Sequence, residues 1–172
     1  MGGAGGGRRA GRGRVVALRE LVVVWLGRRQ REWDALCDEY RQRVDKYLPA
    51  REILLKPAAG DGEDRLRAEA AAVRRALPQP ARLVTLDRRG RSLSSEALSS
   101  YLQKGRDEWP HALAFVVGSD LGLAAELVAE AHLSLSLSAL TLPHQLARLV
   151  LWEQLYRGLS LSAGIKYHRA PL

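Results

Sequence analysis

The chain has 172 residues and a mass of 19.0 kDa, the size of one domain that buries roughly 70 % of its unfolded surface without disulfides or metals. Its 27 Lys and Arg residues against 19 Asp and Glu residues give a net charge of +8, and 47 % hydrophobic with 27 % charged residues excludes a disordered chain. No apolar run is long enough to span a bilayer, and the single cysteine, Cys37, excludes a disulfide framework and a cysteine zinc site. These figures predict a globular domain in a reducing compartment, with a polyanionic partner and no membrane.

The first 14 residues are rich in glycine and arginine, so we expect a disordered extension at 1–14 followed by a single domain over residues 15–172. Four arginines of this segment carry half of the excess charge, which leaves +4 of the +8 on the domain. Arg8–Arg9 before an apolar stretch resembles a twin-arginine export signal, but Arg19 and Glu20 interrupt that stretch. An extension, or a start codon assigned too far upstream, is therefore favoured over export.

Apolar runs of strand length then alternate with helical patterns, which is typical of an α/β domain with a mainly parallel sheet flanked by helices. In chain order we predict a strand over 21–26, a helix over 28–47, a strand over 52–55, a helix over 63–77, a strand over 83–86, a helix from Ser94, a strand over 113–117, a helix over 121–131, a strand over 133–137 and a helix from Pro143.

The last helix is apolar on nearly every face. Its polar side chains are few, and we expect them to face water: Arg148, Glu153, Gln154 and Arg157. A helix of this kind is buried on more than one side. A sister subunit that covers the second side is favoured over a position between the helix's own sheet and a neighbouring helix.

Ligands of parallel α/β sheets bind beyond the carboxyl ends of the strands, which directs attention to the loops after Leu86, Val117 and Leu137. Gly118 and Gly122 let the backbone turn sharply after a strand and approach a ligand closely, although any strand-to-helix turn favours glycine. The loop lacks the Gly-Lys-Ser/Thr of a phosphate-binding loop and the three-glycine dinucleotide fingerprint, which argues against a kinase or a dehydrogenase.

The four histidines are scattered, and no pair has helix spacing with a carboxylate, so we expect no metal site. His111 and His132 are interpreted as structural. His144 opens the last helix, and His168 lies in the polar cluster Lys166–Arg169 near the carboxyl end. Such a cluster is usually a solvated tail, and the alternative is a segment that closes over a site.

Six segments have residue patterns that are specific enough to indicate a protein family. They are Val84–Asp87, Leu93–Glu96, Phe115–Gly118, Leu135–Arg148, Glu153–Arg157 and Tyr167–Arg169. The run Leu-Thr-Leu-Pro-His and the terminal Tyr-His-Arg are the most distinctive parts. Over about residues 21–169, the chain resembles the ribosomal RNA large subunit methyltransferase H family of the SPOUT superfamily.

This resemblance implies a homodimeric α/β domain with a C-terminal trefoil knot, an exception to the rule that chains do not thread loops. It implies methyl transfer from S-adenosylmethionine to N3 of a pseudouridine in large-subunit (23S) ribosomal RNA, on assembled ribosomes in the cytoplasm. The positions that match the family's cofactor site are Leu86, Gly118, Leu137, Ser138, Ala139, Leu140, Thr141 and Leu142.

The chemistry of this reaction suggests roles for three residues. The acceptor N3 must lose a proton before it attacks, and the ring then becomes negative. By hypothesis Arg169 stabilises that anion, while His168 or His144 acts as the base or orients the substrate. The sulfonium is itself activated, so no metal is required.

Two alternative functions remain, and the sequence departs from the family pattern at two places. One alternative is a non-catalytic RNA- or ribosome-binding protein of the same fold, and the other is a SPOUT methyltransferase that acts on tRNA. Ser119 and Asp120 stand where most relatives have a second glycine, often followed by proline. The Asp120 carboxylate could favour the cationic sulfonium or face water. The N-terminal extension is the second departure.

Overall fold

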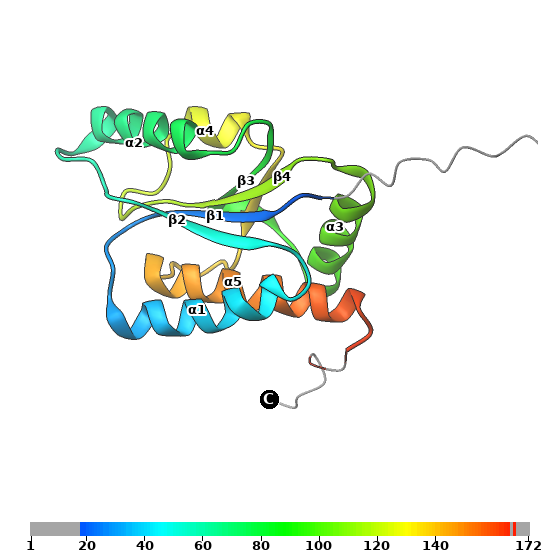
Figure 1. Ribbon diagram of the computed structural model, residues 1–172. Helices are drawn as coiled ribbons and strands as arrows, with labels where there is room; N and C mark the ends of the chain where they lie inside the picture. Colours follow the sequence, from blue (N-terminus) through cyan, green and yellow to red (C-terminus); the bar gives the residue numbers. More distant parts are fainter. Residues whose placement is uncertain (1–17, 166, 168–172) are drawn as a thin grey trace, which may run out of the picture.

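A computed structural model of the chain describes residues 18–165 and 167, and these contain one five-stranded, all-parallel sheet (Figure 1). The strands are β1 (Leu21–Leu26), β2 (Ala50–Leu55), β3 (Ala81–Ser92), β4 (Ala112–Val117) and β5 (Leu133–Ser136). Their order in the sheet is β2-β1-β4-β3-β5. The predicted fold class is confirmed, and β1 has the predicted bounds.

Helices cover both faces of the sheet (Figure 1). On one face lie α1 (Arg31–Asp45), α3 (Ser95–Glu108) and α5 (His144–Ser162), and on the other lie α2 (Gly62–Ala76) and α4 (Ala125–Glu130). Side chains of β1 alternate between the two layers: Val23 packs in the cluster beneath α1 and α5, and Val24 packs in the cluster beneath α2. This double burial explains why β1 is an unbroken apolar run.

Two helices are shorter than predicted because the loops before them belong to the carboxyl edge of the sheet. The helix expected over 28–47 begins at Arg31, since residues 27–30 form a loop whose Gly27 N–H donates to the Leu55 carbonyl (3.0 Å). The helix expected over 121–131 begins at Ala125, because Gly122 adopts a left-handed φ of 82°. The polar start predicted at Ser94 is confirmed, with Ser94 Oγ accepting from Ala97 N–H at 3.1 Å.

The apolar helix α5 lies against the sheet with α1 and α3 beside it (Figure 1). Its own chain therefore buries most of its apolar surface, as in the alternative in which it sits between its sheet and a neighbouring helix. The expectation that Arg148 faces water is wrong, because its side chain is 3 % exposed. Its guanidinium donates to Asp34 Oδ1 (2.7 Å) and to Glu52 Oε2 (2.9 Å), so two carboxylates balance the buried charge.

The pairing of β3 with β5 is unusual. Both Leu86 and Arg91 of β3 pair with Leu135 of β5, in the same parallel direction. The register therefore shifts between Leu86 and Arg91, as at a β-bulge or a similar irregularity. Gly90 lies in this irregular segment, and a Cβ there would come within 2.6 Å of the Ser134 backbone. The C-terminal trefoil knot stays a prediction.

The described part of the chain contains no helix that is both long enough and apolar enough to cross a membrane.

Candidate functional site

Two cavities meet at the carboxyl edge of the sheet, where the loops of a parallel sheet collect. The glycine-loop cavity, of about 470 Å³, lies beyond β3, β4 and β5. The basic cavity, of about 820 Å³, lies beyond β1 and β2. Asp120 and His144 line both cavities, so one wall separates the two spaces.

The glycine-loop cavity gathers most of the cofactor residues that the resemblance implied. The residues that line it include Leu86, Gly118, Leu137, Ser138, Leu140, Thr141 and Leu142, together with His144. Of the described residues that were expected there, Ala139 alone is not part of the lining. Leucine is the most frequent residue type of this lining, which also contains Asp87, Arg88, Arg89 and Asp120.

Hydrogen bonds from two serine hydroxyls shape the loop that enters α5. Ser136 Oγ donates to the Ser138 carbonyl (3.0 Å), and Ser138 Oγ accepts from Leu140 N–H (3.0 Å). The loop therefore presents a preformed backbone to the cavity. Leu140 is 74 % exposed at its tip, an unusual position for a large apolar side chain.

Gly118 and Gly122 have separate structural tasks in the loop after β4. A Cβ on Gly118 would come within 2.4 Å of the Gly122 carbonyl oxygen, so no side chain fits there without opening the loop. Gly122 supplies the left-handed turn, and its N–H donates to the Ser119 carbonyl (3.0 Å). The close approach predicted for Gly118 is thus made to its own loop.

A buried carboxylate ties the two cavities together. Glu69 of α2 is 3 % exposed, and its Oε2 accepts from Ser119 Oγ (2.8 Å) in the wall of the glycine-loop cavity. Its Oε1 accepts from Ala58 N–H (3.1 Å) in the wall of the basic cavity, and from Arg65 Nε (2.9 Å). Ser119, which departs from the family together with Asp120, therefore has a specific partner.

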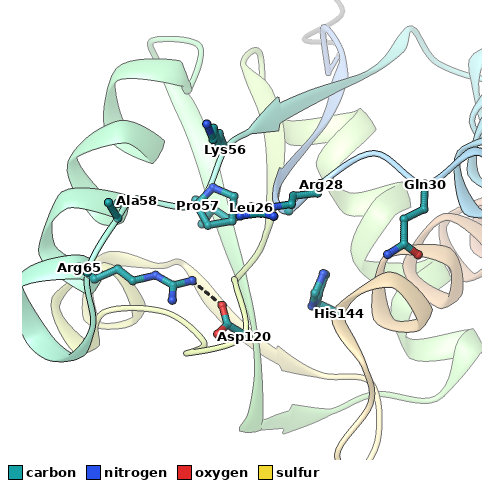
Figure 2. Close-up of a pocket in the computed structure, with 12 residues that line it drawn as sticks. Leu26, Arg28, Gln30, Lys56, Pro57, Ala58, Arg65, Asp120 and His144 are labelled. Carbon is teal, nitrogen blue, oxygen red and sulfur yellow. Dashed lines mark hydrogen bonds and ion pairs between the residues drawn. The ribbon is translucent and has the colours of Figure 1, made fainter.

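Asp120, which belongs to the same departure as Ser119, is matched by a positive charge. Arg65 donates a hydrogen bond to Asp120 Oδ1 across the mouth of the basic cavity (Figure 2). This bond holds the pKa of Asp120 below its usual value and raises the pKa of Arg65. Asp120 is thus ionised, and its side chain is 63 % exposed. The partner of its carboxylate in this structure is Arg65.

His144 lies among the described residues, whereas most of the carboxyl-terminal cluster does not. His144 lies at the boundary of the cavities, with its ring centroid 6.2 Å from that of Trp25 (Figure 2 shows His144 beside the basic cavity). His168 and Arg169 lie outside the described residues. Tyr167 packs on α5 of its own chain, with its ring centroid 4.7 Å from that of Tyr156.

Of the other two histidines, His132 fits its structural interpretation, and the interpretation of His111 stays a prediction. His132 Nδ1 accepts from Leu83 N–H (3.2 Å), and burial lowers the pKa of His132, so the imidazole is neutral. The His111 carbonyl accepts from Arg19 N–H (3.3 Å). Over residues 18–165 and 167, no group of three or more His, Cys, Asp or Glu side chains could hold a metal ion.

Sequence reasoning missed several charged residues of this edge, which include Arg28, Lys56, Arg65, Glu69, Arg88 and Arg89. On the sequence, Arg65 and Glu69 are an ordinary ion pair spaced four residues apart on a helix. The one signal was the departure at Ser119 and Asp120, since new polar side chains in a folded loop need partners.

Comparisons with known proteins identify the family. A family model described as a predicted SPOUT methyltransferase matches residues 20–168. The "Ribosomal RNA large subunit methyltransferase H" of Geotalea daltonii is 37 % identical over 150 residues, which cover 86 % of this chain and 98 % of that protein. The protein of the same name from Nitrobacter hamburgensis is 39 % identical over 158 residues, covering 87 % and 98 %.

Among solved structures, a probable methylase family protein from Haemophilus influenzae aligns with a TM-score of 0.48 and 13 % identity, over 87 % of this chain and 70 % of that one. The family assignment depends on the sequence matches alone, which span nearly the full length of the relatives. The chain belongs to the ribosomal RNA large subunit methyltransferase H family of SPOUT methyltransferases.

Proposed function

We propose that this chain transfers a methyl group from S-adenosylmethionine to N3 of a pseudouridine in large-subunit ribosomal RNA, on assembled ribosomes in the cytoplasm. The observation that carries the proposal is the glycine-loop cavity, because the residues that match the family's cofactor site lie together around one space. Its volume of about 470 Å³ is within the range of small-molecule sites.

The lining of the cavity fits S-adenosylmethionine. Leu86, Leu137 and Leu142 provide apolar walls for an adenine ring, and the backbone of the loops at Gly118 and Ser138 provides hydrogen-bonding groups. When bound, the sulfonium supplies a methyl group that needs no further activation. The task of the chain is then to hold donor and acceptor in line, with the reacting atoms about 3 to 3.5 Å apart.

The acceptor requires a base and a cation. His144 lies on the boundary of both cavities. Its imidazole is therefore a candidate to receive the N3 proton or to orient the ring. Arg169 is assigned the stabilisation of the negative ring, and His168 is the second candidate base. The roles of both carboxyl-terminal residues derive from the family resemblance.

A homodimer is part of the proposal. Leu146, Leu149 and Val150 on α5 remain half-buried in the single chain, and Leu140 is exposed at the site. Together they offer an apolar strip for a second copy. Light scattering after gel filtration measures the mass directly, and a mass of 19.0 kDa at micromolar concentration would contradict the dimer.

The test of the activity is a competition among substrates. Intact ribosomes, free large-subunit rRNA and tRNA are offered to the enzyme with methyl-labelled S-adenosylmethionine, and the labelled nucleotide is identified by mass spectrometry. We expect label on a pseudouridine of ribosomal RNA in intact ribosomes. Label on tRNA would support the tRNA alternative, and no cofactor binding by calorimetry would support the non-catalytic one.

Two variants separate binding from chemistry. Gly118→Val should abolish cofactor binding, because the side chain collides with the Gly122 backbone. Arg169→Ala should lower turnover by about a hundredfold while cofactor affinity stays close to wild type, as for the loss of one group that stabilises a developing anion. Unchanged turnover would remove Arg169 from the mechanism.

A further inference from the structure

The basic cavity is the larger of the two spaces at the site, and the methyl donor does not account for it. Its walls come from the loop after β1 and the loop after β2, including Arg28, Lys56 and Ala58 (Figure 2). It meets the glycine-loop cavity at Asp120 and His144. A ligand in the basic cavity would therefore be next to a ligand in the other.

The basic residues of this cavity differ in whether an acidic side chain balances them. Arg65 is matched by Glu69 and Asp120, so its charge is already satisfied. Arg28 and Lys56 are exposed, and neither has an ion-pair or hydrogen-bond partner for its side chain among residues 18–165 and 167. Two unmatched cations thus face one open space beside the site, and such cations favour a ligand that carries phosphate.

The walls that carry these cations are held in place. Gln145 Nε2 of α5 donates to the Arg28 carbonyl (3.0 Å), and Gly27 N–H donates to the Leu55 carbonyl (3.0 Å). On the other side, Glu69 accepts from Ala58 N–H. The backbone around the cavity is therefore preorganised, which lowers the entropy cost of binding.

We propose that the basic cavity binds the acceptor strand of RNA, with Arg28 and Lys56 on phosphodiester oxygens close to the acceptor nucleotide. The base then lies toward the wall of Asp120 and His144, where it faces the methyl donor. The proposal rests on the proposed function. It adds the part of the protein that holds the acceptor and the residues that contact its backbone.

The test uses two double variants that remove equal charge. Arg28→Ala/Lys56→Ala changes the basic cavity. Lys46→Ala/Arg75→Ala is the control, and both of these residues are exposed. Lys46 directly follows α1 and Arg75 lies in the last turn of α2, so both are at the opposite edge of the sheet. All four side chains lack described partners, so we expect both proteins to fold with unchanged melting temperatures.

Three quantities are measured for each protein: the affinity for large-subunit rRNA at several salt concentrations, the KM for ribosomes, and the Kd for S-adenosylmethionine by calorimetry. For the cavity variant we expect RNA affinity to fall at least tenfold and the slope of log K against log salt to become shallower by roughly 2, one for each lost phosphate contact. The Kd for S-adenosylmethionine should stay unchanged. Arg28→Lys/Lys56→Arg should recover most of the RNA affinity.

Several results would overturn the proposal. One is an RNA affinity and a salt slope equal to those of the control variant. Another is an equal loss of S-adenosylmethionine affinity, which would assign both residues to the cofactor site. A third is uridine monophosphate binding as tightly as RNA, which would make the ligand a free nucleotide. Because RNA binding is measured without turnover, failure of wild-type methylation would contradict the proposed function separately.

Discussion

Replacing Glu69 tests whether one buried carboxylate holds the walls of both cavities. In Glu69→Ala, three donors lose their acceptor: Ala58 N–H, Ser119 Oγ and Arg65 Nε. Arg65 retains Asp120 as a partner. An orphaned buried donor costs about 1 to 3 kcal/mol, so the loss of stability is roughly 3 kcal/mol for the other two donors together.

Glu69→Gln preserves the shape of the side chain. Its carbonyl oxygen can accept from Ala58 N–H and Arg65, and its amide can donate to Ser119 Oγ, which is free to rotate. Only the charge is lost, at a cost of about 1 kcal/mol. For a protein of this length about 1 kcal/mol corresponds to roughly 2 to 4 °C in melting temperature. The expected falls are therefore about 6 to 12 °C for the alanine variant and about 2 to 4 °C for the glutamine variant.

The assay is thermal unfolding followed by circular dichroism, combined with calorimetric titration of S-adenosylmethionine. The alanine variant should also bind the cofactor about tenfold more weakly, since the Ser119 loop loses its anchor. Ser119→Ala is the matched control, because it removes one hydrogen bond and leaves Glu69 paired with Arg65 and Ala58. Equal melting temperatures for Glu69→Ala and wild type would refute the reasoning, and so would equal losses for the alanine and glutamine variants.

Three further predictions concern an ion-paired arginine and two titratable side chains. Arg148→Met should cost about 3 to 5 kcal/mol in urea unfolding, because two carboxylates lose their counter-charge, whereas Arg157→Met should cost at most about 1 kcal/mol; equal costs would contradict this. Burial raises the pKa of Cys37 to about 12, so a thiol reagent at pH 8 should label Cys37 only after unfolding, and stability should fall as the pH rises above about 9, where the unfolded thiol ionises; rapid labelling of the native protein would contradict this. Burial lowers the pKa of His132, so its contribution to stability is present above pH 6.5 and lost as the pH falls; an acid unfolding limb unchanged in His132→Gln would contradict this.

Local patterns in the sequence were sufficient for much of the fold. The unbroken apolar run of β1 marks a strand buried on both faces, and Ser94 marks the start of α3. Gly118 and Gly122 marked a turn beyond a strand. Each of these features leaves a signal in residues that are only a few positions apart in the sequence.

The cofactor positions were found differently. They came from the resemblance to a family, because leucine, glycine, alanine, serine and threonine at these eight positions form no side-chain motif that physical reasoning can detect. The structure places seven of the eight around one cavity, and leaves Ala139 outside its lining. The binding role of these positions stays a proposal, as do the roles of His168 and Arg169, which lie outside the described residues.

Only the tertiary structure decided the environment of the charged residues. Arg148, in an apolar helix, looked like a solvent-facing residue, and it is buried because Asp34 and Glu52 meet it from 114 and 96 residues away. Ser119 and Glu69 are likewise 50 residues apart. Whether a charge is buried or exposed depends on which partner the folded chain brings to it, and no periodicity in the sequence records that distance. Helices, strands and turns could therefore be predicted from neighbouring residues. The two cavities and the Glu69 carboxylate between them could be identified only in the folded chain.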